Sequence, residues 1–255
     1  MRFCPSEPSV AANMPAVKLT VIGCSPAWPN PGGAHSGYLV EGRGSLLLDC
    51  GPGVLRRLRE RSRWPALDAI AITHFHLDHW GDLVPWVWGS LYLSGGNPIR
   101  PELWVPTGGR AILEDFGSRF GFSDMFDRVF VLREYEAGTP FEAAGFTITG
   151  RRVPHYTIEA NGFHVSDGET TLAYSGDSAP SEELGELAAD ANLFLCEATL
   201  ARGADDGDLR GHLALDEAQA AFSASRAKRL IVVHRPVELE TKGCELAWDG
   251  MTIDL

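Results

Sequence analysis

The sequence has few cysteines, and their placement excludes two classes of protein. The five cysteines are scattered along the chain and never form a Cys-x-x-Cys pair: Cys4, Cys24, Cys50, Cys196 and Cys244. An odd number without paired spacing speaks against both a disulfide framework and a zinc ribbon. Free cysteines are typical of a reducing compartment, so we expect a cytoplasmic protein.

Long apolar runs are also missing. The longest runs end after about six to eight residues, whereas a membrane-spanning helix needs about eighteen or more. The N-terminal stretch MRFCPSEPSVAANMP contains no apolar signal core, and residues 1–15 are expected to form a disordered lead-in. We expect no membrane contact, and a single domain over residues 16–255, because a chain of this length can bury a full core.

Positive charge is scarce. Lysine and arginine number 22 against 34 aspartates and glutamates, which gives a net charge of −12. The densest basic run, RRLRERSR at 56–63, follows a helical pattern with Val54, Leu55 and Leu58 on its inner face, so it is expected to be a solvated helix surface. Proteins bind long polyanions by neutralising phosphates, so this balance disfavours a large nucleic-acid footprint.

Short β-rich runs and helical patterns both recur along the chain. Strands are expected at 17–23, 38–41, 45–49, 69–73, 103–105, 128–132, 146–153, 163–165, 171–175, 193–197 and 229–233. Helices are expected at 53–62, 83–93, 109–119, 181–189 and 214–225. Because strict βαβ alternation is absent, the pattern favours an α+β fold in which helices cover two sheets, an αββα sandwich.

The stretch THFHLDHWGD, residues 73–82, places three histidines and two aspartates directly after an expected strand. His74 and His76 are two residues apart and point the same way in extended backbone, and Asp78 and His79 follow after a turn. Imidazole nitrogens and carboxylate oxygens are ligands for Zn²⁺ and its neighbours. The stretch therefore predicts a metal site.

Four ligands on one loop cannot complete two metal sites, and other strand ends supply further donors. His155, Asp177 and His234 each follow an expected strand, and such ends can converge at one rim of a sandwich. Asp177 can bridge two cations, while His155 and His234 complete one site each. We expect two divalent metal ions, with Zn²⁺ favoured and Mn²⁺ or Fe²⁺ compatible with the same ligands.

The motif His-x-His-x-Asp-His, with the later histidines and the aspartate of SGDS, resembles the metallo-β-lactamase superfamily from about Val17 to the end. The resemblance implies a metallo-β-lactamase sandwich and a hydrolase. It also implies that one metal is held by His74, His76 and His155, the other by Asp78, His79 and His234, with Asp177 shared.

A narrower resemblance covers LAYSGDS to AKRLIVVH, which is similar to the tRNase Z-like phosphodiesterases. In that branch a glutamate of the EAT motif orients a histidine, here Glu197 and His212, that protonates the leaving oxygen. The implied enzyme attacks a phosphodiester with a hydroxide held between two metals, and its catalytic residues are Asp78, Glu197 and His212. Without the resemblance, a surface carboxylate and a helix-capping histidine are equally good interpretations of Glu197 and His212.

The members of this branch that process tRNA carry an additional arm between the third metal histidine and the bridging aspartate. Asp177 follows His155 by only 22 positions, which two strands and a turn fill. The sequence therefore resembles the arm-less members, which include bacterial cyclic-nucleotide phosphodiesterases, and we expect a small phosphodiester as substrate. Three alternatives stay open: a tRNase Z-type RNA endonuclease, a lactone, thioester or β-lactam hydrolase, and a non-catalytic binding protein.

Four further features carry weaker expectations. His35 is expected to be a loop residue or a substrate contact, and His164 a structural residue of a strand. By resemblance, Asp49 supports the metal loop from behind. The aromatic run PWVWGSLYL, residues 85–93, is expected to be core or the face of a homodimer, with a nucleobase-stacking wall as the alternative.

Overall fold

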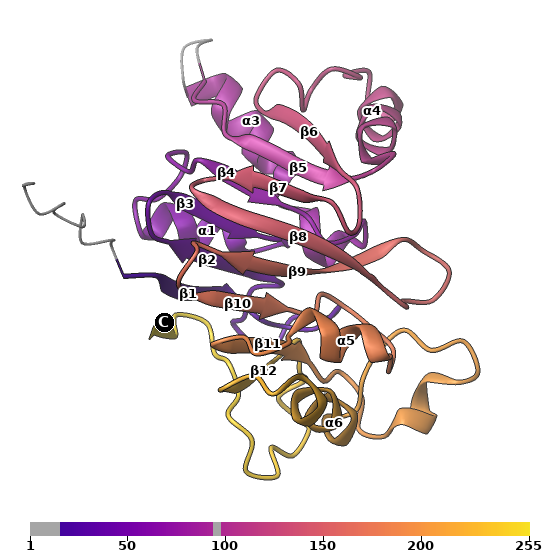
Figure 1. Cartoon of the computed structure of the whole chain (residues 1–255). Coiled ribbons are helices and arrows are strands. Elements are labelled where there is room, and N and C mark those ends of the chain that lie inside the picture. Colours follow the sequence, from indigo (N-terminus) through magenta and orange to yellow (C-terminus); the bar gives the residue numbers. More distant parts are fainter. Residues whose placement is uncertain (1–15, 94–97) are drawn as a thin grey trace, which may run out of the picture.

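A computed structural model describes residues 16–93 and 98–255 (Figure 1). The expected lead-in, residues 1–15, lies outside the described residues. The strands are β1 (Lys18–Gly23), β2 (Gly37–Glu41), β3 (Ser45–Leu48), β4 (Ala69–Ala71), β5 (Glu102–Pro106), β6 (Val131–Tyr135), β7 (Pro140–Ala143), β8 (Phe146–Val153), β9 (Ala160–Ser166), β10 (Thr171–Tyr174), β11 (Leu193–Glu197), β12 (Leu230–Val233) and β13 (Thr252–Asp254).

The described strands form two sheets. One sheet has seven strands in the order β13-β1-β2-β3-β4-β5-β6, and the other has six in the order β12-β11-β10-β9-β8-β7. The helices are α1 (Val54–Glu60), α2 (Leu77–Trp80), α3 (Leu83–Leu93), α4 (Gly109–Arg119), α5 (Glu182–Leu187) and α6 (Leu215–Ser225), with a short 3₁₀ helix η1 (Gly203–Asp206).

Strand side chains are buried on both faces of each sheet, which produces the layered architecture. In β3, Leu46 and Leu48 belong to the core between the two sheets, whereas Leu47 belongs to the core beneath α1, α3 and α4. A third cluster packs α5 and α6 against the six-stranded sheet. The layers are therefore helix, sheet, sheet and helix, which confirms the expected αββα sandwich (Figure 1).

Most expected elements are present, and the differences lie in short or irregular segments. The helix bounds 83–93 and 109–119 match α3 and α4. The strand expected at 128–132 instead begins at Val131, because residues 128–130 continue a turn. Strands β7 and β13 and the one-turn helix α2 were not expected, since segments of three or four residues contain too few positions to show a periodicity.

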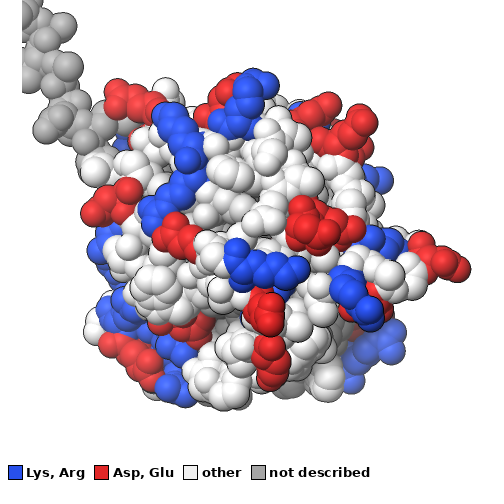
Figure 2. Space-filling view, turned by 90° about the horizontal axis from the view of Figure 1, so that it is seen from below, with Lys and Arg blue, Asp and Glu red and all other residues white. Residues whose placement is uncertain are grey.

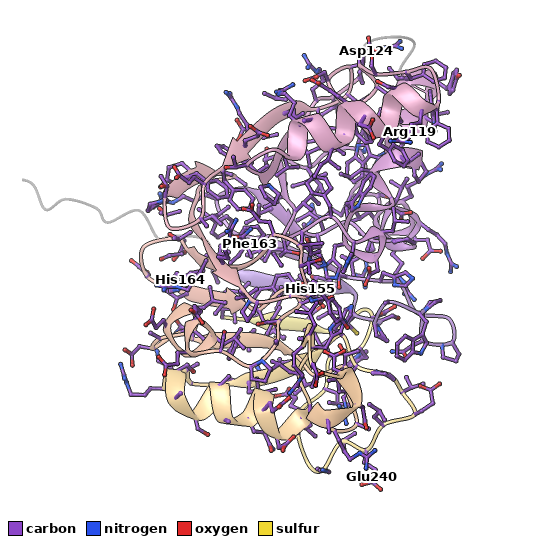
Figure 3. The ribbon with its side chains drawn as sticks, turned by 90° about the vertical axis from the view of Figure 1, so that its right-hand side faces the viewer. Arg119, Asp124, His155, Phe163, His164 and Glu240 are labelled. Atoms are coloured by element: carbon purple, nitrogen blue, oxygen red, sulfur yellow. The ribbon has the colours of Figure 1, made fainter. Side chains whose placement is uncertain are left out.

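Parallel pairing brings the chemically interesting strand ends to one edge. β10 pairs parallel with β11, and β11 pairs parallel with β12. β9 runs antiparallel to both β8 and β10, so β8 and β10 point the same way. The loops that follow β8, β10, β11 and β12 consequently leave the sheet at the same edge. His155, in the loop after β8, marks this edge and lies near the middle of the view in Figure 3.

None of the helices in the described part of the chain combines the length and the apolarity needed to cross a lipid bilayer.

Candidate metal centre

The seven expected ligands converge into two groups at this edge of the sandwich. Within each group the possible ligand atoms lie within 4.8 Å of one another, and Asp177 belongs to both. One group contains His74, His76, His155 and Asp177, and the other contains Asp78, His79, Asp177 and His234. The structure thus brings together every expected metal ligand, in the same division that the family resemblance implies.

The local backbone explains how one short stretch can serve both groups. The backbone at His76 is extended, with φ −74° and ψ 140°, and His74 and His76 both reach the first group. The helical turn of α2 begins at the next residue and aims Asp78 and His79 at the second group. Gly51 makes room for this turn, because a Cβ atom there would lie 1.9 Å from the carbonyl oxygen of Asp78.

Hydrogen bonds behind the site fix which ring nitrogen each histidine presents. His155 Nδ1 lies 2.6 Å from the carbonyl oxygen of Gly211, and His79 Nδ1 lies 2.7 Å from Asp49 Oδ2. A carbonyl or carboxylate oxygen can only accept, so Nδ1 carries the proton in both rings. In neutral His155 and His79 the Nε2 lone pair is therefore free for a metal.

Two threonines extend the same arrangement to the remaining histidines. The Thr73 hydroxyl lies 2.9 Å from Asp49 Oδ2 and 3.0 Å from His74 Nδ1. The Thr199 hydroxyl lies 2.7 Å from Glu197 Oε2 and 2.8 Å from His234 Nδ1. Each hydroxyl can donate to the carboxylate and accept from the ring, which again leaves Nε2 unprotonated.

Asp177 stands at the centre of the two groups. Its Oδ2 atom lies 3.2 Å from His79 Nε2, 3.7 Å from His234 Nε2, 3.8 Å from His74 Nε2 and 3.9 Å from His155 Nε2. Its other oxygen, Oδ1, is buried and has no hydrogen-bond partner among the described residues, and the same holds for His74 Nε2. A buried polar atom without a partner is costly, and a cation at each group would satisfy both atoms. The residues therefore fit a divalent metal site.

The packed imidazoles and carboxylates shift one another's pKa values. Burial holds the pKa of His74 well below its ordinary value. Burial also lowers the pKa of His79, but the carboxylates of Asp177 and Asp49 outweigh it and hold this pKa well above the ordinary value. Burial opposes ionisation of Asp177, yet the charges of His234 and His79 hold its pKa well below the usual range. A neutral imidazole and an ionised carboxylate are the forms that bind a metal, so the pKa shifts of His74 and Asp177 favour binding, whereas His79 must release a proton when a metal binds.

Glu197 and His212 form a buried pair beside the two groups. Glu197 Oε1 accepts hydrogen bonds from His212 Nδ1 at 2.9 Å and from the Ser178 backbone N–H at 2.9 Å. Burial lowers the pKa of His212, but the charge and hydrogen bond of Glu197 outweigh it and raise the pKa to about 9. Since Nδ1 is occupied by Glu197, His212 can offer Nε2–H to a substrate.

The loop that carries His212 is fastened by a residue that the sequence did not single out. Asp206 Oδ2 accepts hydrogen bonds from the backbone N–H groups of Gly211 at 2.6 Å and His212 at 3.0 Å. The Oδ1 atom of Asp206 accepts a hydrogen bond from the hydroxyl of Tyr156 at 2.8 Å, and Tyr156 is the residue that follows His155. Nothing in the run GADDGD distinguishes Asp206 from its neighbours, whereas Thr73 and Tyr156 could have been suspected because each adjoins a ligand histidine.

A cleft of about 610 Å³ opens onto both groups. His76, Asp78 and His212 line it together with apolar side chains. This volume is typical of a pocket for a small molecule.

The structure also places the three residues for which the sequence carried weaker expectations, Asp49, His164 and His35. Asp49 contacts His79 and Thr73, as expected for a supporting carboxylate. His164 on β9 is a structural residue, because its ring bonds to the Leu187 carbonyl 3.1 Å away (Figure 3). His35 bonds to the Pro26 carbonyl at 2.8 Å and is a loop residue that does not line the cleft.

The first part of the aromatic run of α3 belongs to the core, whereas Tyr92 at its end is 79% exposed. Trp86 is fully buried and packs edge-on against Trp64, and Trp88 packs against Phe122. None of the aromatic residues of α3 lines the cleft. The nucleobase-stacking alternative for this run is therefore wrong.

Comparison with known proteins places this architecture in a family. The sequence pattern of the "Beta-lactamase superfamily domain" matches residues 45–235. The probable metallo-hydrolase YhfI of Bacillus subtilis is 30% identical over 224 residues, which cover 86% of this chain and 87% of the relative. A ribonuclease Z of Mycobacterium bovis is 28% identical over 194 residues, 70% of this chain and 69% of the relative.

Solved structures show the same fold. The crystal structure of YhfI from Bacillus subtilis superposes with a TM-score of 0.82 at 23% identity, over 94% of this chain and all of that chain. Human tRNase Z, short form, superposes with a TM-score of 0.72 at 24% identity, over 93% of this chain and 98% of that chain. The chain belongs to the β-lactamase superfamily and is a metal-dependent hydrolase with the metallo-β-lactamase fold.

Proposed function

We propose that this hydrolase is a phosphodiesterase of small phosphodiesters, with a cyclic nucleotide as the expected substrate. The observation that carries the proposal is the Glu197–His212 pair, 2.9 Å apart, at the edge of a cleft that also exposes ligands of both metal groups. An alkoxide leaving group needs a proton, and a histidine held by a carboxylate is suited to supply it.

In the proposed reaction, the two groups of His and Asp residues would hold two divalent metals, with Zn²⁺ expected. Such metals supply a nucleophilic water at neutral pH and neutralise charge on the phosphoryl oxygens. Asp78 lines the cleft and can accept a hydrogen bond from the attacking water. His212 donates the Nε2 proton to the departing oxygen, while Glu197 keeps the ring in place and stabilises its charged form.

The structure supports a small substrate over pre-tRNA. Between His155 and Asp177 the chain forms only the hairpin of β9 and β10, so no arm is inserted there. The face drawn in Figure 2 intersperses Lys and Arg with Asp and Glu and shows no broad positive patch. A long polyanion would need such a patch, and the net charge of −12 opposes its approach.

The relatives support phosphorus chemistry without deciding the substrate. They include proteins named ribonuclease Z, and the solved structure of a diphosphatase of the PhnP family shares the fold with a TM-score of 0.74. Hydrolysis of a lactone, thioester or β-lactam by the same metal groups is the second candidate. We favour this candidate less, because the proposed hydrolysis of these substrates does not use the buried Glu197–His212 pair as a proton donor.

A substrate panel tests the proposal. Metal-replete enzyme would be assayed with 3′,5′- and 2′,3′-cyclic nucleotides, bis(p-nitrophenyl) phosphate, a lactone, a thioester, a β-lactam and pre-tRNA. We expect turnover of at least one cyclic nucleotide, and salt-independent, weak binding of RNA. Turnover of only the lactone, the thioester or the β-lactam would contradict the proposal. Steeply salt-dependent cleavage of pre-tRNA would also contradict it.

A further inference from the structure

One wall of the cleft beside the metal groups is apolar, although the chemistry expected there is ionic. The cleft floor carries His76, Asp78 and His212, and its apolar lining consists of Ala27, Trp28, Phe75, Leu77 and Leu200. These apolar residues come from three separate segments, which follow β1, β4 and β11, and Leu77 is the first residue of α2. A phosphodiester group alone would gain nothing from such a wall.

Trp28 is the most conspicuous member of this wall. Its side chain is 52% exposed, and Leu77, which lines the same cleft, is 61% exposed. Among the described residues, none makes a ring contact with Trp28 or hydrogen-bonds its indole N–H. Phe75 differs, because its ring packs against Trp80 with the centroids 5.8 Å apart. Trp28 is thus an indole whose flat face has no partner within the described fold.

The charges of the cleft limit the ligand further. No lysine or arginine lines it, and two of its residues are Asp78 and Asp206. Both oxygens of Asp206 are already engaged by Tyr156 and by the backbone of Gly211 and His212. Apart from His212, which is assigned to the leaving oxygen of the reacting phosphate, no cationic side chain lines the cleft. Additional phosphates would therefore meet carboxylates without a counter-charge of their own, so the cleft suits a ligand with one phosphate group.

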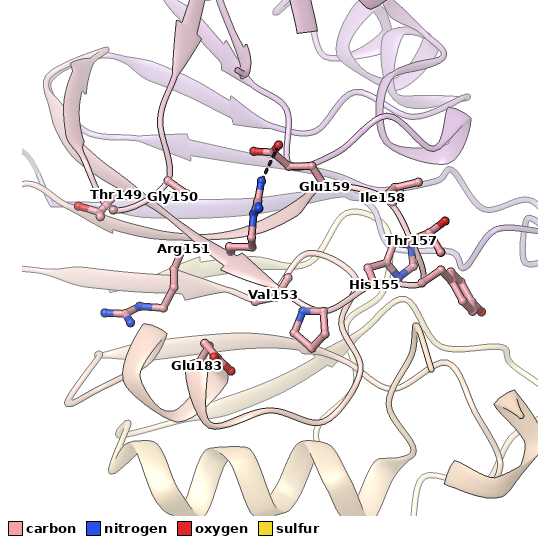
Figure 4. A pocket seen from close by; sticks show the side chains of 14 residues that line it. Thr149, Gly150, Arg151, Val153, His155, Thr157, Ile158, Glu159 and Glu183 are labelled. Atoms are coloured by element: carbon pink, nitrogen blue, oxygen red, sulfur yellow. Dashed lines mark ion pairs between the residues drawn. The ribbon is translucent and has the colours of Figure 1, made fainter. Parts of the chain in front are cut away.

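The adjacent groove offers no alternative path for phosphates. This groove, next to His155, contains Arg151 and Arg152 (Figure 4). Arg152 pairs with Glu159 at 2.6 Å, and Arg151 pairs with Glu186. Both guanidinium groups are therefore neutralised within the chain, and the groove gives no positive track along which a polynucleotide could run.

We infer that Trp28, with Leu77 and Phe75 beside it, forms a base-binding subsite that stacks the nucleobase of a mononucleotide carrying a single phosphate. The inference rests on the proposed function for the reacting group and adds the recognition of the neutral part of the substrate. Stacking on an aromatic side chain is largely independent of base identity, since every base has a π face. The subsite thus selects mononucleotides over small phosphodiesters that lack a planar group.

Binding measured by calorimetry tests the subsite without any turnover. Metal-replete protein would be titrated with adenosine 5′-monophosphate and with ribose 5-phosphate, which differ only in the base. We expect the nucleotide to bind about tenfold or more tightly than the sugar phosphate, the range that alanine replacement of stacking aromatics shows. Trp28→Ala should abolish this advantage, whereas Trp28→Phe should keep part of it.

Trp248→Ala is the matched control. Trp248 is 59% exposed, similar to Trp28, but lines a different hollow beside Asp249. It should leave both affinities unchanged. Equal loss in the two variants would show that the effect is not specific to the cleft.

Kinetics separate failure of the subsite from failure of the proposed function. With a cyclic nucleotide as substrate, Trp28→Ala should raise KM about tenfold and leave kcat nearly unchanged.

If the wild-type protein hydrolyses the nucleotide and Trp28→Ala changes neither KM nor the base advantage, the subsite is wrong and the phosphodiesterase stands. If no cyclic nucleotide is hydrolysed yet the base advantage depends on Trp28, the function is wrong and the subsite stands. A change of oligomeric state in Trp28→Ala with unchanged nucleotide affinity would assign the indole to a contact with a second copy.

Discussion

Asp177 has the most demanding position of any single residue in this molecule. It is almost completely buried, it faces the Nε2 atoms of four histidines at 3.2 to 3.9 Å, and its Oδ1 atom has no partner among the described residues. A buried carboxylate in such a position is tolerated only when opposite charge compensates it. The residue therefore connects the two metal groups electrostatically as well as geometrically.

Asp177→Ala should remove at least one metal from the purified protein, because both groups lose a shared ligand. Elemental analysis after gel filtration would measure the metal-to-protein ratio. Asp254→Ala, at an exposed position on β13, is the control and should keep the wild-type ratio. A wild-type ratio in Asp177→Ala would refute the bridging role.

His212→Ala separates proton donation from metal binding at the same scale. The variant should keep its metal but lose turnover of a cyclic nucleotide by about 10²- to 10⁴-fold, the usual contribution of a general acid. The loss should be much smaller with bis(p-nitrophenyl) phosphate, whose leaving group departs without a proton. His164→Ala, on β9, should behave as the wild type. A uniform loss on both substrates would argue that His212 binds a metal instead.

At the scale of elements, the site depends on loops held by carboxylates and not on the strands alone. α2 turns the metal loop so that Asp78 and His79 face the second group. η1 places Asp206 beneath the backbone of Gly211 and His212. His234 itself adopts the left-handed conformation, with φ 52°, directly after β12. Such a conformation is costly for a residue other than glycine, and it is typical of functional sites.

Asp206→Ala tests the loop as a positioning element. Without the two backbone hydrogen bonds, His212 should shift relative to the cleft and kcat should fall on the order of 10- to 100-fold, since small displacements of a catalytic group are expensive. KM and the metal content should change little. Asp208→Ala is a close control, because Asp208 is exposed in the same loop and lies outside η1. If the two variants lose activity equally, Asp206 has no special role in placing His212.

At the scale of the whole molecule, the two sheets and the metal groups should stabilise each other. The ligands come from the loops after β4, β8, β10 and β12, which belong to both sheets. A metal bound to the folded chain but not to the unfolded chain raises the free energy of unfolding, by about 2.7 kcal/mol at a concentration one hundred times Kd. It also compensates the buried charge of Asp49, Asp78 and Asp177.

Treatment with a chelator should therefore lower the melting temperature of the wild-type protein by several degrees. Differential scanning calorimetry before and after dialysis against EDTA, and after return of Zn²⁺ or Mn²⁺, would measure the shift and rank the metals. Asp177→Ala should melt at a temperature that responds less to chelator. An unchanged melting temperature in the wild type would mean that the metals contribute little to folding.

Much of the fold was predictable because its signals are local. Regular runs such as β8, α3 and α4 show a periodicity over enough residues to fix their bounds. β7, α2 and β13 were missed because three or four residues carry almost no pattern. β13 forms only through pairing with a distant strand, as Thr20 of β1 pairs with Thr252 of β13, whereas β7 forms a local hairpin with β8. The aromatic run of α3 was predicted as core or the face of a homodimer, and the core part is confirmed for Trp86, which Trp64 and Phe130, far away in sequence, help to bury.

By itself the sequence determined which side chains can bind metal and how His74, His76, Asp78 and His79 are spaced. Glu197 and His212 were assigned a role only through the resemblance to the tRNase Z-like phosphodiesterases. These properties are local, because the type of each metal-ligating side chain and its spacing along the sequence do not depend on folding. Only the tertiary structure decided the rest. It showed which histidine Nδ1 atoms form hydrogen bonds within the protein, as in His155. It also showed that Asp206 accepts hydrogen bonds from the loop that carries His212, and that Trp28, not α3, lines the cleft. Some of those relations join residues far apart in sequence, such as His155 and Gly211, which only the folded chain brings within hydrogen-bonding distance. Asp206 and His212 are close in sequence, but their contact depends on the conformation of the loop between them.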